Sequence, residues 1–96
     1  MENTKEYSGL FIIAPEKLDQ LDEVKQSIGS SIGEKSGAIV TENVIGKKAL
    51  AYPVKKRNEG VYYEVIFKAV PTDVPRMMNR FRINTDILRA IVDARE

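Results

Sequence analysis

The spacing of apolar residues changes several times along the chain, and each change predicts a new element. The segment from Tyr7 to Ala14 is short, almost wholly apolar and followed by Pro15, which predicts a buried strand. Alternation along this strand places Gly9, Phe11 and Ile13 on one face, with Leu10 and Ile12 on the other. Because both faces are apolar, we expect neither side of the strand to be freely solvated.

After Pro15, apolar residues recur every three or four positions and polar residues fill the gaps. This period predicts an amphipathic helix whose first turn holds Pro15 and Glu16. Two glycines weaken its last turns, and Ser36 with Gly37 is expected to end it. The predicted buried stripe consists of Leu18, Leu21, Val24, Ile28 and Ile32.

The middle of the chain predicts an interrupted strand and a hairpin. Residues 38–44 have strand composition, Gly46 marks a bulge, and extended structure resumes through Leu50, Tyr52 and Val54. Pro53 has no amide hydrogen to donate, so this strand should lie at a sheet edge. Residues 57–60, with the sequence Arg-Asn-Glu-Gly, have hairpin-loop composition.

The remaining elements are a strand, a helix and a last strand. Residues 61–68 alternate and predict a half-buried strand, and Pro71 opens a helix with Thr72 as its cap. The apolar stripe of that helix is Val74, Met77, Met78 and Phe81. After a turn at residues 84–86, the last strand should place Leu88, Ala90 and Val92 on one face and Ile87, Arg89 and Ile91 on the other.

The predicted order, β-α-β-β-α-β, indicates an α+β ferredoxin-like split βαβ sandwich. In this fold two helices cover one face of a four-stranded antiparallel sheet. The first and third strands are central, and the second and fourth lie at the edges. We expect a single domain over residues 1–96, with an ordered core of about residues 5–93.

Composition limits the chemistry that this domain can carry. The chain has no Cys and no His, so it lacks a thiol nucleophile, an imidazole base and the usual zinc ligands. We therefore expect no enzyme, no metal site and no cofactor. No apolar run approaches the roughly 18 residues of a membrane span, and the first residues do not resemble a signal peptide. A cytoplasmic protein with no membrane partner is the expectation.

Charge is distributed unevenly. Residues 1–45 carry eight acids and four bases, whereas residues 46–96 carry six acids and eleven bases. Five of these bases form what we call the basic ridge: Lys47, Lys48, Lys55, Lys56 and Arg57. The ridge is typical either of an edge strand protected against sheet-to-sheet pairing or of a nucleic-acid contact. Tyr52 between the lysine pairs and Tyr62 after the loop favour the second reading.

Two further patterns concern binding surfaces. The residues around Gly60 fit the aromatic pattern of the RNA-recognition motif only at the glycine and one aromatic, so base stacking of that type is not expected. The sheet face away from the helices should expose apolar side chains, and such a patch indicates a protein partner. The predicted partner contacts are Leu10, Ile12, Tyr62, Ile66 and Ile91, with Ile87 as a further candidate for this face. Ile12, Tyr62 and Ile66 should lack cover in the isolated domain.

Two motifs carry a resemblance to a known family. Residues 46–55, GKKALAYPVK, are similar to the signature G-x-[KR]-x-L-A-Y-P-I-x, and residues 82–89 are similar to the ending R-x-N-x-x-[VI]-[IL]-R. Over roughly residues 7–92 the chain resembles the bacterial ribosomal small-subunit protein six family. Ala49 and Val54 depart from the common residues of the signature, and Lys5 stands where relatives often have arginine.

The resemblance implies a structural, non-catalytic component of the small ribosomal subunit without a cofactor. It implies binding to the central domain of small-subunit ribosomal RNA, as a heterodimer with the eighteenth small-subunit protein. The RNA-binding residues expected on this basis, together with the ridge, are Lys5, Lys47, Lys48, Tyr52, Lys55, Lys56, Arg57, Arg82 and Arg89. The alternative is a small-molecule-sensing regulatory domain of the same fold; the ribosomal reading expects no small-molecule substrate.

Overall fold

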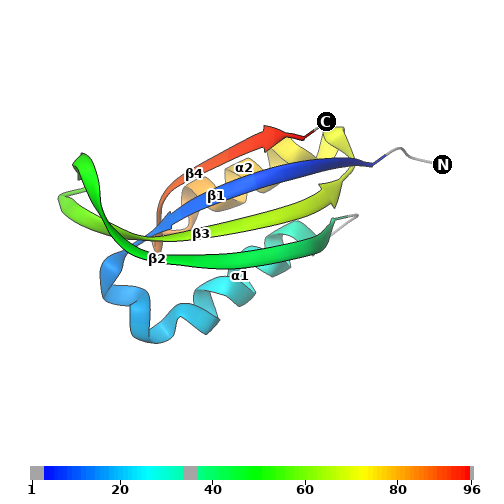
Figure 1. Ribbon diagram of the computed structural model, residues 1–96. Coiled ribbons are helices and arrows are strands. Elements are labelled where there is room, and N and C mark those ends of the chain that lie inside the picture. Colours follow the sequence, from blue (N-terminus) through cyan, green and yellow to red (C-terminus); the bar gives the residue numbers. More distant parts are fainter. Residues whose placement is uncertain (1–3, 34–36, 96) are drawn as a thin grey trace.

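The computed structural model describes residues 4–33 and 37–95 and contains two layers, a twisted sheet and a pair of helices (Figure 1). The elements in chain order are β1 (Lys5–Ile13), η1 (Pro15–Gln20), α1 (Leu21–Gly33), β2 (Ala38–Val54), β3 (Arg57–Ala69), η2 (Pro71–Asp73), α2 (Val74–Ile83) and β4 (Ile87–Ala94).

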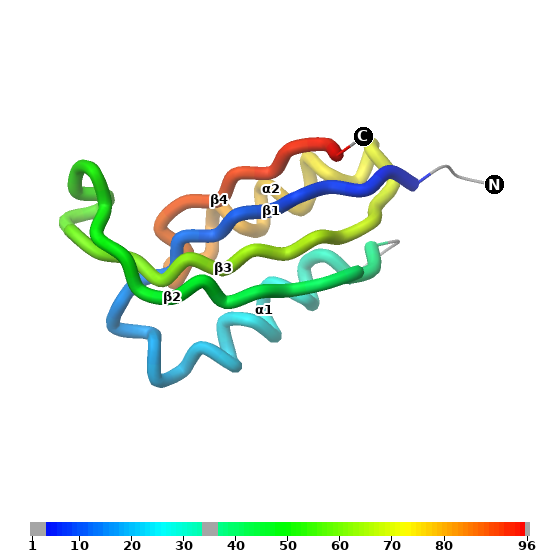
Figure 2. The backbone as a smooth tube through the Cα atoms, in the orientation of Figure 1, coloured from blue at the N-terminus to red at the C-terminus, as the bar shows by residue number. Residues whose placement is uncertain are grey.

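The strand order in the sheet is β2-β3-β1-β4, and every neighbouring pair is antiparallel. The predicted fold class is therefore confirmed, with β1 and β3 central and the proline-containing β2 at an edge. The β2–β3 hairpin extends past the adjacent ends of β1 and β4, and its far end bends out of the plane of the sheet (Figure 2). This extension contributes to an elongated molecule of 44 × 24 × 22 Å.

The main core lies between the sheet and the helices. Phe11, Tyr63 and Phe67 from the central strands are fully buried there, against apolar residues of α1 and α2. Phe11 meets Phe81 of α2 edge to face, with 4.8 Å between ring centroids. Large aromatic rings packed in this way bury much apolar area for a chain of this length. We call this side of the sheet the helix face and the other side the open face.

The helix starts differ from prediction. Residues 15–20 form the 3-10 helix η1, whose period of three residues leaves Leu18 exposed instead of in the buried stripe. Thr72 does not cap the second helix, because η2 precedes it and Asp73 occupies the cap position without a side-chain cap bond. α1 is described as far as Gly33, and the predicted stop at Ser36 lies outside the described residues.

β4 also differs at its first residues. A register shift opposite Ile12 and Ile13 inserts one extra residue into β4, and a one-residue shift moves side chains to the other face. Ile87 therefore packs in the helix-face core, and Leu88 joins Ile12 on the open face. The prediction was the reverse for these two residues, whereas it is confirmed for Arg89 and Ile91, which pair with open-face residues of β1.

The hairpin turn is formed by Lys55 and Lys56, and not by residues 57–60 as predicted. Val54 pairs with Arg57, so the two lysines are the whole loop. Both have left-handed backbone angles, with φ of 48° and 68°. Two-residue turns of this kind match the twist of the strands but favour Asn-Gly. Because two lysines stand here instead, the turn could not be predicted from the residue types at this position.

β2 contains three irregularities before the turn. Its pairing with β3 shifts between Ile39 and Thr41, between Val44 and Gly46, and between Ala49 and Val54. Gly46 has a φ of +119°, a conformation that side chains disfavour. The predicted bulge at Gly46 is therefore confirmed.

Candidate nucleic-acid interface

The far end of the hairpin folds over part of the open face. Leu50, Val54 and Tyr62 pack there against a small buried cluster of Ile12, Ala14 and Leu88. Gly60 makes this approach possible, because a Cβ atom at its position would lie 2.4 Å from Cγ2 of Ile12. The sequence of β3 thus has a glycine where the side chains of Ile12 and Leu50 both lie close to the strand.

This covering changes the predicted partner surface. Ile12 is 7 % exposed and Ile66 is also buried, so the expectation that both lack cover in the isolated domain is wrong. Leu10 and Tyr62 are half-buried, and Ile91 is 38 % exposed. The accessible apolar part of the open face therefore centres on β1 and β4 beyond the hairpin.

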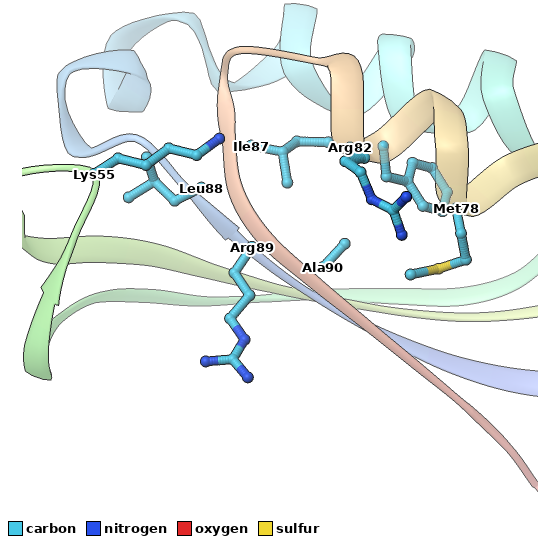
Figure 3. A pocket seen from close by; sticks show the side chains of 8 residues that line it. Lys55, Met78, Arg82, Ile87, Leu88, Arg89 and Ala90 are labelled. Atoms are coloured by element: carbon cyan, nitrogen blue, oxygen red, sulfur yellow. The ribbon is translucent and has the colours of Figure 1, made fainter.

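The folded hairpin also brings distant cations together. Lys55 from the turn, Arg82 from the end of α2 and Arg89 from β4 line one hollow of about 230 Å³. Its remaining lining is apolar and comes from Met78, Phe81, Ile87, Leu88 and Ala90 (Figure 3). No acidic residue lines this hollow, and none of the three cations forms an ion pair with another described residue. We call it the cationic hollow.

Tyr52 lies next to this group. Its ring is 63 % exposed, and its hydroxyl oxygen is 3.5 Å from Nη1 of Arg89. An exposed ring beside unpaired cations is an arrangement that suits single-stranded nucleic acid. Sequence reasoning had singled out Tyr52, Lys55, Arg82 and Arg89 separately, and the structure places them together.

Arg57 has a different environment from the other ridge residues. Its guanidinium donates to both carboxylate oxygens of Glu16 in η1, one of them through Nε at 3.2 Å, and to the carbonyl of Lys55 at 3.0 Å. The hydrogen bond from Arg57 lowers the pKa of Glu16 to about 2. Arg57 therefore joins the hairpin to η1, and its charge is already balanced.

The rest of the predicted RNA-binding set is dispersed. Lys47 and Lys48 pair with Val61 and Gly60, so they point to opposite faces of β2. Lys5 pairs with Ala69 at the opposite end of β3 from the hairpin. The basic ridge is thus one segment of sequence but not one surface, and Lys5 lies far from it.

A family model described as ribosomal protein S6 matches residues 6–92. The chain belongs to the ribosomal protein S6 family. A protein named small ribosomal subunit protein bS6 from Clostridium novyi is 37 % identical over 91 residues, covering 92 % of this chain and 94 % of that one. The namesake from Helicobacter acinonychis is 35 % identical over 91 residues, which cover 92 % of this chain and 63 % of the longer relative.

Solved structures agree with this membership in the S6 family. The crystal structure of 30S ribosomal protein S6 from Thermotoga maritima superposes with a TM-score of 0.77 at 28 % identity, covering 97 % of this chain and 89 % of that one. The C-terminal domain of MgtC from Mycobacterium tuberculosis gives a TM-score of 0.67 at 12 % identity, covering 100 % and 93 %. At such low identity the second likeness shows the shared fold alone.

Two other cations of this S6-family chain, Lys25 and Arg76, are paired and structural. Nζ of Lys25 lies 3.1 Å from a carboxylate oxygen of Glu42, which also accepts a hydrogen bond of 3.1 Å from the hydroxyl of Tyr63. These bonds, that from Lys25 first, lower the pKa of Glu42, whereas burial raises the pKa of Tyr63. Asp73 and Arg76 form a similar close pair. The Lys25–Glu42 pair links α1 to β2, and the Asp73–Arg76 pair joins residues at the start of α2. In both pairs the positive charge is balanced by an acid of the same chain.

Sequence reasoning missed a second hollow beside the first. It measures about 130 Å³ and is lined by Ile12, Leu50, Ala51, Tyr52, Val54, Tyr62 and Arg89. The alternation of Leu50, Tyr52 and Val54 was the available signal, since it places an apolar row on one side of an extended segment. Only the curl of the hairpin shows that this row faces β1. We call this space the tyrosine hollow.

The described residues contain no group of three or more acidic side chains that could hold a metal ion. Within the same residues, neither helix is long and apolar enough to cross a membrane.

Proposed function

We propose that this chain is a non-catalytic structural component of the small ribosomal subunit and binds small-subunit ribosomal RNA. The observation that carries this proposal is the cationic hollow, which Lys55, Arg82 and Arg89 line without an acid. A phosphate bound there would neutralise charge that the protein leaves unbalanced and would release counterions from the RNA. All three residues lie within the two family motifs, Lys55 in the first and Arg82 and Arg89 in the second, and the names of the S6 relatives supply the ribosomal context.

The second part of the proposal is a heterodimer with the eighteenth small-subunit protein, formed on the open face beyond the hairpin. Ile91 is exposed there, with Leu10 half-buried beside it in register. A net charge of +1 gives the domain little attraction for RNA at physiological salt. A basic partner would supply the missing charge, and each ligand would then raise the affinity of the other by the same factor.

The small-molecule-sensing alternative has less support. The cationic hollow and the tyrosine hollow, at about 230 and 130 Å³, are below the roughly 300–1,000 Å³ typical of pockets for drug-sized ligands. Each of these two has room for a chemical group and not for a whole metabolite of that size. A third hollow of about 320 Å³ is lined by Asp22, Lys25, Gln26 and Glu42, and it lacks the apolar lining of such pockets. The likeness to the MgtC domain does not favour sensing either, because it rests on fold alone.

The salt dependence of RNA binding tests the RNA part of the proposal. With about four phosphate contacts, the slope of log affinity against log salt should be about −3 to −4. Replacing Lys55, Arg82 and Arg89 by alanine should flatten this slope by about 2 to 3. Lys68→Ala removes one exposed lysine near the opposite end of the sheet and is the matched control for Lys55→Ala. If Lys55→Ala and Lys68→Ala reduce the salt slope and the RNA affinity equally, the assignment of the RNA site to the cationic hollow is contradicted.

The ribosomal part is tested by sedimentation of a cell lysate, in which the protein should move with small subunits. Finding it only in the free fraction would contradict the proposal. The heterodimer is tested by titrating the RNA with this protein, with the partner, and with both. Equal affinity in the presence and absence of the partner would exclude the cooperative model.

A further inference from the structure

The cationic hollow and the tyrosine hollow are neighbours that share one wall. Arg89 lines both of them. In Figure 3 the guanidinium of Arg89 is directed away from the amine of Lys55 and the guanidinium of Arg82. Its charged end is instead close to the hydroxyl of Tyr52, at 3.5 Å. The charges of Lys55 and Arg82 therefore belong to the cationic hollow, and the charge of Arg89 lies at the tyrosine hollow.

We propose that the two hollows together bind one unpaired nucleotide of an RNA. Its base enters the tyrosine hollow, and its backbone phosphate lies at Lys55 and Arg82. This inference rests on the proposed RNA-binding function and adds to it the kind of RNA feature that the site selects.

The tyrosine hollow has the chemistry of a base site. Tyr52 and Tyr62 supply aromatic surface, and Ile12, Leu50 and Val54 supply an apolar floor. A flat base gains stacking energy on such rings. Arg89 adds hydrogen-bond donors at the rim, which suit the acceptor atoms that guanine presents at its edge. No acid lines the hollow to compete for Arg89.

An unpaired base is required because of access. A base inside an RNA helix is stacked on both sides by its neighbours, so neither face of its ring is open to a tyrosine. A bulged or loop base can instead be turned out of the stack at small cost. The hollow, at about 130 Å³, accepts one group of this kind.

The cationic hollow has the complementary chemistry. Lys55 approaches from the hairpin and Arg82 from α2, so two donors reach the same space from separate elements (Figure 3). Phosphate is favoured here over a neutral group because two cations line one largely apolar hollow without a counter-charge.

The backbone of the turn supports the same assignment. Lys55 and Lys56 both have positive φ, where lysine is less favourable than asparagine or glycine. Strain of this kind concentrates at binding sites, where the surrounding structure maintains it. Here it fixes the direction from which Lys55 enters the cationic hollow.

The test uses three short RNA duplexes that are identical except at one position: fully paired, with one bulged guanosine, and with an abasic bulge. Binding to the whole chain is measured by fluorescence anisotropy at low salt, where electrostatic attraction is strong. We expect the guanosine bulge to bind about tenfold more tightly than the abasic bulge, the range expected for one stacked base. Equal affinity for these two RNAs would overturn the inference.

Two single variants of Tyr52 and one double variant of Lys55 and Arg82 distinguish the roles of the two hollows. Tyr52→Ala should remove the preference for guanosine over the abasic bulge, and Tyr52→Phe should retain most of it because the ring remains. Replacing Lys55 and Arg82 by alanine should weaken binding of all three RNAs and flatten their salt dependence. Tyr52 is exposed, so circular dichroism should show the fold of its variants unchanged.

The outcomes distinguish this inference from the function on which it rests. Salt-dependent binding that is equal for all three RNAs would overturn the nucleotide site and leave the RNA-binding function standing. Failure of all three RNAs to bind at low salt, both to the chain alone and to the chain with its purified partner protein, would overturn both. If Tyr52→Ala leaves RNA preference intact and instead abolishes capture of the purified partner protein, the hollow receives a protein side chain and the inference is wrong.

Discussion

The two faces of the sheet are formed by the same strands but are covered in different ways. On the helix face, α1 and α2 exclude water completely from Phe11, Tyr63 and Phe67. On the open face, the chain covers only the half near the hairpin, using its own β2 extension. The comparison indicates that the helix face supplies most of the stability. The binding site is built by the hairpin half of the open face together with the neighbouring part of β4 and the end of α2.

Charged residues follow the same division. Lys25 on the helix side is held by Glu42, and Arg76 by Asp73, so these cations fasten elements to each other. Lys55, Arg82 and Arg89 have no acidic partner among the described residues. Substitutions should therefore separate stability from binding according to the region in which they are made.

The largest expected effect comes from the helix face. Phe11→Ala should lower the free energy of unfolding by about 3–5 kcal/mol, because it leaves a cavity beside Tyr63 and Phe81. Chemical denaturation measures the loss. Leu10→Ala, one residue away on the half-buried open face, is the control and should cost clearly less. Similar losses for both would contradict the difference between the faces.

Gly60→Ala should produce the next largest effect. The new methyl group would overlap the side chain of Ile12, and overpacking of this kind costs about 1–3 kcal/mol. The hairpin should also separate from the open face, which limited proteolysis would detect as faster cleavage near the turn. Gly33→Ala is the matched control, since nothing lies within 4 Å of that position.

A smaller effect of opposite sign is expected at the turn. Lys56→Gly should raise the free energy of unfolding by about 1 kcal/mol, because glycine removes the strain of the positive φ at this residue. Lys48→Gly, in a regular strand position, should instead destabilise the protein. Both changes remove one lysine, so a comparison of their unfolding curves isolates the backbone. Destabilisation by Lys56→Gly would show that the turn is not strained.

The smallest effect concerns the pair of Glu16 and Arg57. The folded state lowers the pKa of Glu16 from 4.5 to about 2, so the pair stabilises the fold above about pH 4.5, and this contribution disappears as pH falls toward 2. Glu16 is at the surface, where such pairs are weak and screened by salt. Glu16→Gln should therefore lower the Tm slightly at pH 7 and low salt, and should make no difference near pH 2. A difference of equal size at both pH values would contradict this account.

The sequence was sufficient for the topology because the periods of β1, α1, β3 and α2 are set by local burial. It was insufficient at places where geometry depends on distant contacts. The extra residue in β4 is visible only opposite Ile12 and Ile13, and the turn at Lys55 and Lys56 lacks the usual residues. For the same reason, the sequence named Lys55, Arg82 and Arg89 as separate cations but could not place them around one hollow.

The long edge strand β2 bears on whether the free protein aggregates. Its 17 residues leave Val40 and Ile45 about 48 % and 41 % exposed, and an edge of this composition could recruit further chains into fibrils. Both residues coincide with shifts in register between β2 and β3. Because a growing fibril needs a straight and regular template, these two kinks protect newly made molecules from aggregation.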